Sequence, residues 1–275
     1  MSEATSRCTK AVVLARGLGT RMRRAVPGAV ATPGQAAMAD QGVKAMIAMT
    51  DDRPFLDYIL SGLADAGITN IGVVIGPEHD VIRRRYDTEV ALSRLKVTFL
   101  IQSEPRGTAD AVLAAEEFAA GEPFLVVNGD NLYPRAALEA LAALPGSGLV
   151  GYRRDSLIAA SNIEPERIAR FALIWLDRTG GLARVVEKPH PAEATTSDLI
   201  SMNSWRFGSA IFEACRAIGP STRGELELQD AVSYAITELG ERFEVVVSAE
   251  GVLDLSTRAD IEAVAGRLAL LPVVL

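Results

Sequence analysis

A glycine pair follows the first apolar run of the chain, within the segment Arg16-Gly17-Leu18-Gly19-Thr20-Arg21-Met22. Glycines spaced by one residue let the backbone approach a ligand closely and direct successive N–H groups at phosphate oxygens. Arg21 adds a planar guanidinium that binds phosphate through paired hydrogen bonds. The segment therefore indicates a phosphate-binding loop, while a tight turn between a strand and a helix would need the same glycines for steric reasons alone.

Two common nucleotide-binding loops are excluded by single positions of this segment. The dinucleotide-binding fingerprint needs a third glycine or an alanine where Met22 stands. The phosphate loop of nucleoside triphosphatases needs Lys and then Ser or Thr after its last glycine, whereas Thr20 and Arg21 follow Gly19. The sequence therefore argues against a nucleotide-dependent redox domain.

Short apolar runs and helical patterns alternate along the first half of the chain. The runs suited to buried strands are 11–15, 71–75, 97–101, 124–127 and 149–152, and helical spacing occurs at 55–63, 81–86, 108–119 and 135–143. Such alternation is typical of parallel βαβ units, which place ligand sites at the carboxyl ends of strands. We predict an α/β fold with a doubly wound, mostly parallel mixed sheet.

The pattern changes after about residue 154. Residues 168–175 and 182–187 flank a turn at 177–181 and predict a β-hairpin, and helical patterns return at 225–239 and 257–271. We expect one domain over residues 1–275, made of a first part at about 10–154 and a mixed part at about 155–275. Residues 25–42 are rich in Ala, Gly and Pro without clear periodicity, and they predict a long mobile loop in the position of a lid.

Composition narrows the classes of partner. The net charge of −7 offers no general attraction for nucleic acid or anionic lipid, and no apolar stretch reaches the roughly 20 residues that span a bilayer. Cys8 and Cys215 are expected to be reduced residues of a cytoplasmic protein, and with only His79 and His190 the sequence argues against a closed zinc site. Assembly into a homo-oligomer stays open.

The segment from Val12 to Met22 resembles the signature of the sugar nucleotidyltransferases, also called nucleotide-sugar pyrophosphorylases, and in particular the glucose-1-phosphate thymidylyl- and uridylyltransferases. The resemblance continues in order to about Ile261. It implies the Rossmann-like nucleotide-diphospho-sugar transferase fold, with nucleotide bound by residues 10–154 and a small β-rich sugar-binding part in residues 155–275. It also implies the reaction of a sugar 1-phosphate with a nucleoside triphosphate, with Mg²⁺ as cofactor.

The resemblance assigns roles to matching positions. Arg21 would contact the leaving pyrophosphate, Lys44 the nucleotide phosphates and Lys188 the sugar phosphate, as the catalytic cations. The expected nucleotide contacts are Leu14, Ala15, Gly17, Gly19, Thr20, Gln102, Pro105, Gly107 and Thr108. The expected sugar contacts are Gly151, Glu187, Lys188 and Asn203. Asp130, in Asn128-Gly129-Asp130-Asn131, and Asp254, in Leu253-Asp254-Leu255-Ser256-Thr257, would bind Mg²⁺.

The implied chemistry agrees with the residues that the chain offers. A phosphate monoester has its second pKa near about 6, so the attacking oxygen is already an anion and needs no general base. Mg²⁺ accepts carboxylate and phosphate oxygens, which suits Asp130 and Asp254. A purely structural role stays open for each aspartate. Asn-Gly-Asp-Asn is favourable turn sequence, and Asp254 precedes Ser256 and Thr257 as a residue at a helix N-terminus would. Arg16 either reaches phosphate or faces solvent.

Gln102 carries the base preference. Its amide donates and accepts at once, which matches the adjacent imide carbonyl and N–H of uracil or thymine and favours UTP or dTTP over other triphosphates. Two positions depart from the family pattern, because Ala45 stands where proline is usual and Trp205 where a small residue is usual. Together with the unusual segment 25–42, they motivate an alternative, a non-catalytic nucleotide-sugar sensor or regulatory subunit. Which sugar is used is left open.

Overall fold

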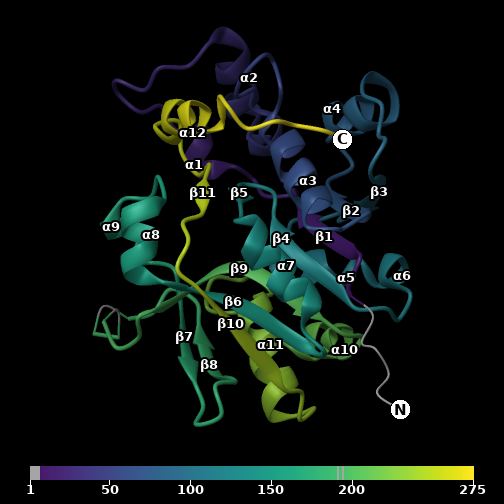
Figure 1. Cartoon of the computed structure of the whole chain (residues 1–275), viewed down its shortest axis with the longest axis vertical. Helices are drawn as coiled ribbons and strands as arrows, with labels where there is room; N and C mark the ends of the chain where they lie inside the picture. The colour runs from purple at the N-terminus through teal and green to yellow at the C-terminus, as the bar shows by residue number, and fades with distance from the viewer. Residues whose placement is uncertain (1–6, 191, 194) are drawn as a thin grey trace.

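A central sheet organises the computed structural model, which describes residues 7–190, 192–193 and 195–275 (Figure 1). No helix in this described part of the chain is long and apolar enough to cross a membrane. The strand order is β10-β6-β9-β4-β1-β2-β3, with β7 paired to β8 and to β9 at the side. The strands are β1 (Lys10–Leu14), β2 (Asn70–Ile75), β3 (Lys96–Ile101), β4 (Phe124–Asn128), β6 (Ser147–Arg153), β7 (Ala172–Leu176), β8 (Leu182–Val186), β9 (Leu199–Phe207) and β10 (Phe243–Ser248).

Most main-path strand pairs are parallel. β1 pairs in parallel with β2 and β4, β2 with β3, and β6 with β10, while β9 runs antiparallel between β4 and β6. The predicted mostly parallel mixed sheet is therefore confirmed. A small second sheet joins β5 (Asn131–Leu132) to β11 (Leu253–Asp254), antiparallel.

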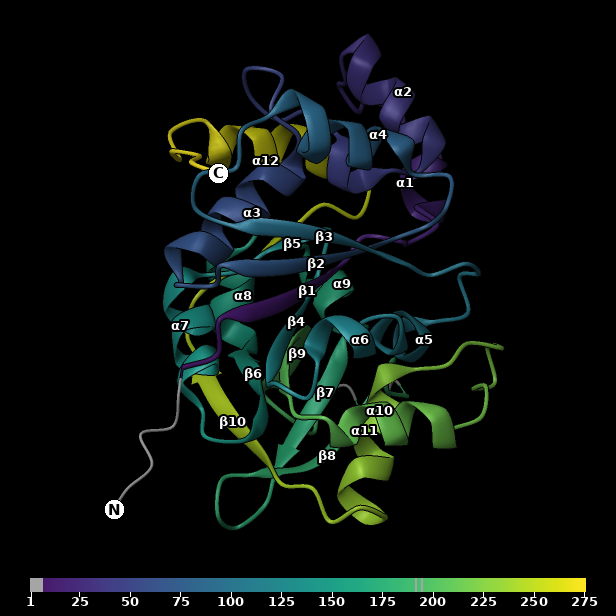
Figure 2. The same cartoon turned by 90° about the vertical axis from the view of Figure 1, so that its right-hand side faces the viewer.

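Both faces of the large sheet are buried. Along β1, Ala11 and Val13 pack into one hydrophobic cluster and Val12 packs into the other, as expected of a parallel strand covered by helices on both sides. Helices α3 (Phe55–Asp65), α7 (Arg135–Ala143) and α12 (Asp260–Leu268) contribute to the first cluster. Helices α5 (Thr108–Leu113), α10 (Ala210–Ala217) and α11 (Leu228–Thr237) contribute to the second. Figures 1 and 2 show α12 near α1 at one end of the molecule, with α10 and α11 at the other.

The remaining helices are short. They are α1 (Thr20–Arg23), the 3-10 helix η1 (Lys44–Met46), α4 (Asp80–Arg84), the π-helix η2 (Arg85–Glu89), α6 (Glu116–Ala119), α8 (Arg154–Ala160) and α9 (Pro165–Ile168). The helical pattern at 108–119 is thus split into α5 and α6. The hairpin β7–β8 is present, but its first strand begins at Ala172 because α9 occupies the residues up to Ile168.

The prediction of a long loop at 25–42 is wrong for its second half, which forms α2 (Pro33–Gln41). Thr32 and Gln35 form a capping box, in which each side chain bonds the backbone N–H of the other, and Pro33 occupies the first turn. The Gln35 side chain also donates to the carbonyl of Ala48 at 2.7 Å, which ties the helix to the segment after Lys44. Helix α2 has no clear apolar face, so its periodicity gave no signal, whereas its capping residues did.

Candidate active site

A cavity of about 380 Å³ opens at the carboxyl end of β1. All nine predicted nucleotide contacts line it, together with Arg21, Lys44 and Asp130. These residues come from four separate segments: the glycine loop, η1, the stretch after β3 and the turn after β4. Parallel strands carry the segments to one edge of the sheet, where a single ligand reaches all of them.

At two positions of the cavity, the backbone conformation and the close neighbours admit only glycine. Gly19 has φ 61°, and a Cβ there would overlap the carbonyl oxygen of Gly42. Gly107 has φ 127°, and a Cβ there would overlap the backbone of Leu226. The Leu226 backbone N–H also donates to Arg106 O at 2.8 Å and its carbonyl accepts from Ala109 N at 2.9 Å, so the second half of the chain closes one wall of the cavity.

Gln102 is 4% exposed, and its amide group is already held. Its Nε2 donates to the carbonyl of Gly107 at 3.1 Å and to Asp110 Oδ2 at 2.8 Å. Both N–H hydrogens of the amide therefore have acceptors inside the protein, which fixes the Nε2 and Oε1 positions. The group that remains for a ligand is the oxygen Oε1, so Gln102 accepts a hydrogen bond rather than donating and accepting at once.

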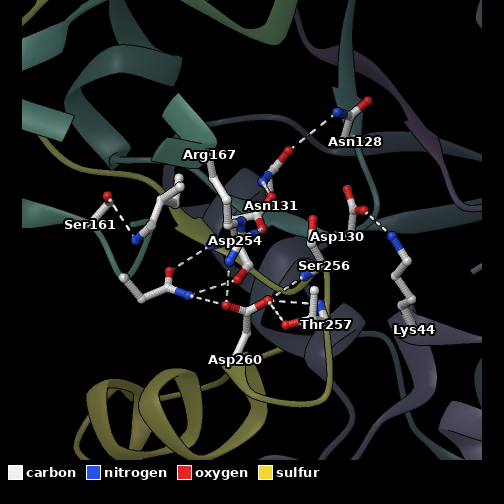
Figure 3. A network of polar contacts seen from close by, with 12 residues as sticks. Lys44, Asn128, Asp130, Asn131, Ser161, Arg167, Asp254, Ser256, Thr257 and Asp260 are labelled. Atoms are coloured by element: carbon white, nitrogen blue, oxygen red, sulfur yellow. Dashed lines mark hydrogen bonds and ion pairs between the residues drawn. The ribbon is translucent and has the colours of Figure 1, made fainter. Parts of the chain in front are cut away.

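Lys44 and Asp130 form an ion pair, with Nζ 2.7 Å from Oδ2 (Figure 3). Lys44 opens η1 and Asp130 lies in the turn between β4 and β5, so the pair closes the cavity from two sides. Among the described residues Asp130 Oδ1 accepts no side-chain hydrogen bond. Arg21 is exposed at the cavity wall in α1, while the next residue, Met22, is buried in the core.

Asp254 lies beside Asp130 but not on the cavity wall. Asp254 is opposite Asn131 in the β5–β11 pair, and Leu255 N donates to Asp130 O at 2.8 Å. The Asp254 side chain forms an ion pair with Arg167 and accepts from Asn131 Nδ2 at 3.0 Å. Burial raises the pKa of Asp254 and neighbouring Asp130 adds to the rise, while Arg167 opposes it. The helix-terminal alternative for Asp254 is wrong, because β11 ends there and α12 starts only at Asp260.

The donor chemistry of this region suits Mg²⁺. Asp130 and Asp254 are carboxylates on hydrogen-bonded backbone segments, and Asp130 Oδ1 is available towards the cavity. Within the described residues no group of three His, Cys, Asp or Glu side chains is placed to hold a metal ion. A cation here would therefore draw further ligands from water and substrate phosphates, as Mg²⁺ commonly does.

Two of the predicted sugar contacts, Glu187 and Asn203, form a second cluster that does not line the cavity. Gln229, at the start of α11, donates to Glu187 Oε2 at 3.1 Å and to Asn203 Oδ1 at 2.9 Å. Lys188 and Asn203 have φ 47° and 57°, left-handed conformations that cost energy in residues other than glycine and that cluster at functional sites. Gly151 lies apart from these residues within β6, where a Cβ would contact Val245.

The segment before α11 connects the cluster to the cavity. Glu225 lines the cavity, and Gln229, four residues later, holds Glu187 and Asn203. Burial raises the pKa of Glu187 to about 7. The nearby Arg223 guanidinium opposes this rise, whereas three neighbouring carboxylates add to it, those of Glu227, Glu225 and Asp230. The roles of Gln229, Asp110 and Arg167 were not predicted, because the partners of each are defined only by the fold.

The two departures from the family pattern are interior residues. Trp205 is 0% exposed, stacks on Phe207 at 5.7 Å between ring centroids and donates through Nε1 to Asn203 Oδ1 at 3.2 Å. It therefore positions Asn203 from the core side. Ala45 is largely buried in η1 and lines the cavity next to Lys44. Arg16 does not face solvent: it is buried, pairs with Glu78 at 2.7 Å and donates to Gln102 O at 3.2 Å.

Three comparisons with known proteins agree. A family model described as nucleotidyl transferase matches residues 10–265. The UTP–glucose-1-phosphate uridylyltransferase AglF of Haloferax volcanii is 30% identical over 230 residues, which are 82% of this chain and 83% of that protein. A glucose-1-phosphate thymidylyltransferase of Streptomyces antibioticus is 32% identical over 231 residues, 82% of this chain and 57% of that protein. A solved UDP-glucose pyrophosphorylase complexed with UDP-glucose shares the fold, with a TM-score of 0.74 at 18% identity over 95% of this chain and 98% of that one.

Proposed function

Since the chain belongs to the nucleotidyl transferase family, we propose that it joins a sugar 1-phosphate to UTP or dTTP and releases pyrophosphate. The observation that carries the proposal is the cavity, which unites the glycine loop, Arg21, Lys44, Gln102 and Asp130. The names of the uridylyl- and thymidylyltransferase relatives support a pyrimidine triphosphate and a hexose 1-phosphate. We assign the reaction to the cytoplasm, where nucleoside triphosphates are made.

The chemistry is one in-line displacement. An oxygen of the sugar 1-phosphate forms a bond to the α-phosphorus, and the bond between the α-phosphorus and the bridging oxygen breaks, so that pyrophosphate leaves with that electron pair. Arg21 and the backbone N–H groups near Gly17 and Gly19 hold the leaving phosphates, and Lys44 turns from Asp130 towards the α-phosphate. Mg²⁺ held by Asp130, with Asp254 beside it, would neutralise phosphate charge. Lys188, Glu187 and Asn203 orient the sugar phosphate and hydroxyls.

The base preference follows from the held amide of Gln102. Its free Oε1 accepts the imide N–H of uracil or thymine, whereas the N3 atom of cytosine is itself an acceptor and would face an unpaired oxygen. A site built to pair with an N–H group rejects a base that lacks it. UTP and dTTP are therefore the expected substrates, and CTP is the informative competitor.

A substrate matrix tests the proposal. The protein is incubated with Mg²⁺, each of five nucleoside triphosphates and several sugar 1-phosphates, and pyrophosphate release is measured. Release is expected with UTP or dTTP, and it should require the sugar 1-phosphate. Asp130→Ala should abolish turnover while unfolding stays cooperative, since this side chain is at the cavity wall. Absence of release from the wild-type protein across the matrix would refute the proposal.

The alternative of a non-catalytic nucleotide-sugar sensor rests on Ala45, Trp205 and the segment 25–42. Ala45 lines the cavity, and Trp205 donates a hydrogen bond to Asn203. Tight binding of a nucleotide sugar without pyrophosphate release, unaffected by Asp130→Ala, would favour the sensor over the transferase.

A further inference from the structure

Arg167 lies between two buried carboxylates near the proposed metal site (Figure 3). It projects from α9 and forms ion pairs with Asp254 and with Asp260, the latter at 2.6 Å from NH1 to Oδ1. Both carboxylate side chains are 6% exposed. One guanidinium therefore neutralises two carboxylates that come from β11 and from the first residue of α12.

The two carboxylates are fixed from several sides. Asp260 Oδ2 accepts the backbone N–H groups of Ser256 and Thr257, at 3.2 and 2.7 Å. The Asp254 backbone exchanges two hydrogen bonds with the Asn162 side chain, each 2.8 Å long. Asn131 holds the other oxygen of Asp254. The carboxylates are consequently anchored to the backbone.

Arg167 is the less anchored member of the group. Its side chain is 21% exposed, and its buried Nε has no hydrogen-bond partner among the described residues. A long arginine side chain can rotate away at the cost of its two ion pairs, whereas Asp254 cannot leave without breaking β11 contacts. Any exchange of partners at Asp254 therefore occurs by movement of Arg167.

We infer that Arg167 acts as a built-in cation that occupies the Asp254 carboxylate in the absence of metal and sets the protein's affinity for divalent ions. The inference rests on the proposed function only in taking Asp130 and Asp254 as the metal-binding pair. Three carboxylates, those of Asp130, Asp254 and Asp260, face two cations, Lys44 and Arg167. A divalent ion that ligates Asp254 must displace a guanidinium already held by two anions, so Arg167 opposes its binding.

Divalent-ion binding to the nucleotide-free protein tests this inference, with Mn²⁺ as the probe and free Mn²⁺ counted by electron paramagnetic resonance. In Arg167→Gln the Mn²⁺ affinity should rise by about tenfold or more, because the carboxylates lose their competing partner. Asp254→Asn alone should lower the affinity by about tenfold, because the ion loses a carboxylate ligand. In the double variant the gain should disappear.

Arg85→Gln is the matched control. Arg85, on η2, forms a similar ion pair with the buried Asp57 on α3, and neither residue lines the cavity. Loss of the Arg85 side chain should therefore leave the Mn²⁺ affinity unchanged. An Arg167→Gln protein that unfolds cooperatively and binds Mn²⁺ no more tightly than the wild type overturns the inference. If that variant does not fold, Arg167→Lys decides: its compact ammonium cannot reproduce the paired contacts with both carboxylates, so the Mn²⁺ affinity should rise, and an unchanged affinity overturns the inference.

The outcome is separate from that of the pyrophosphate assay. Tighter Mn²⁺ binding in Arg167→Gln together with no pyrophosphate release by the wild type would refute the proposed function alone. Normal release together with unchanged Mn²⁺ affinity would refute the role of Arg167 alone.

Discussion

Asp110 orients Gln102, the residue that we propose contacts the base. Its carboxylate accepts from Gln102 Nε2 at 2.8 Å and so keeps the amide oxygen turned towards the ligand. Asp110 is itself partly buried on α5, within reach of Arg106 at 3.9 Å. Without the carboxylate, only the Gly107 carbonyl opposes rotation of the amide by half a turn, which would place its N–H group towards the base.

Asp110→Leu should therefore weaken discrimination between pyrimidines rather than abolish turnover. We expect the ratio of kcat/KM for UTP to that for CTP to fall by about tenfold, the value of one lost hydrogen-bond preference. Steady-state kinetics with both triphosphates measure the ratio. Arg106→Gln, which alters an exposed neighbour of Asp110, should leave the ratio unchanged. A ratio in Asp110→Leu equal to that of the wild type would show that Gln102 is held by other contacts.

Glu187 makes stability depend on pH. Its pKa is raised by burial from 4.5 to about 7, so between these values the folded protein binds more protons at Glu187 than the unfolded chain does. The folded state consequently loses stability as pH rises through this window, and Glu187→Gln removes the loss. We expect the variant to gain about 1 kcal/mol relative to the wild type between pH 5 and pH 8. Urea unfolding at pH 5 and at pH 8 measures the free energy of unfolding of both proteins. If the variant and the wild type differ in stability by the same amount at both pH values, Glu187 does not have a raised pKa.

At the scale of elements, α2 is defined by its first turn. The capping box of Thr32 and Gln35 satisfies N–H groups that would otherwise lack partners, in a helix of nine residues. The helix ends at Gly42, whose backbone approaches Gly19 of the phosphate-binding loop. Order in α2 is thereby coupled to the shape of the cavity wall.

Thr32→Ala should destabilise α2 by about 1 kcal/mol, the usual cost of a lost N-cap. Amide hydrogen exchange at residues 35–41 should become faster by about fivefold, while exchange in β1 and β4 stays unchanged. Thr88→Ala, which removes an exposed hydroxyl on η2, serves as the control. Equal protection of α2 in Thr32→Ala and the wild type would show that packing alone maintains the helix.

Sequence patterns predicted those elements whose signal is local. Strand and helix alternation predicted the mostly parallel sheet, and the family resemblance selected nine residues as nucleotide contacts, all of which line the cavity. Helix α2 was missed because its signal is a cap and not a periodic face. The strand after residue 168 was extended too far because α9 and β7 share one apolar run.

At the scale of the whole molecule, the contacts that tune the site join distant segments. Arg167 and Asp254 are separated by 87 positions, and Trp205 contacts the predicted site residue Asn203 through a hydrogen bond between the two side chains. Pairings of this kind depend on the topology that brings α9, β9 and β11 together, so residue types alone do not predict them. The two halves meet where the Leu226 backbone bonds those of Arg106 and Ala109, beside the cavity that Glu225 lines.

The central claim is that an oxygen of the sugar 1-phosphate attacks the α-phosphorus of a pyrimidine triphosphate. A sugar 1-phosphate labelled with ¹⁸O in its phosphate group, combined with UTP or dTTP, Mg²⁺ and the wild-type protein, tests this by mass spectrometry of both products. The account predicts that the label stays in the nucleotide sugar, including its bridging position, and that the pyrophosphate is unlabelled. Label in the pyrophosphate, or triphosphate cleavage that yields no nucleotide sugar, would contradict it.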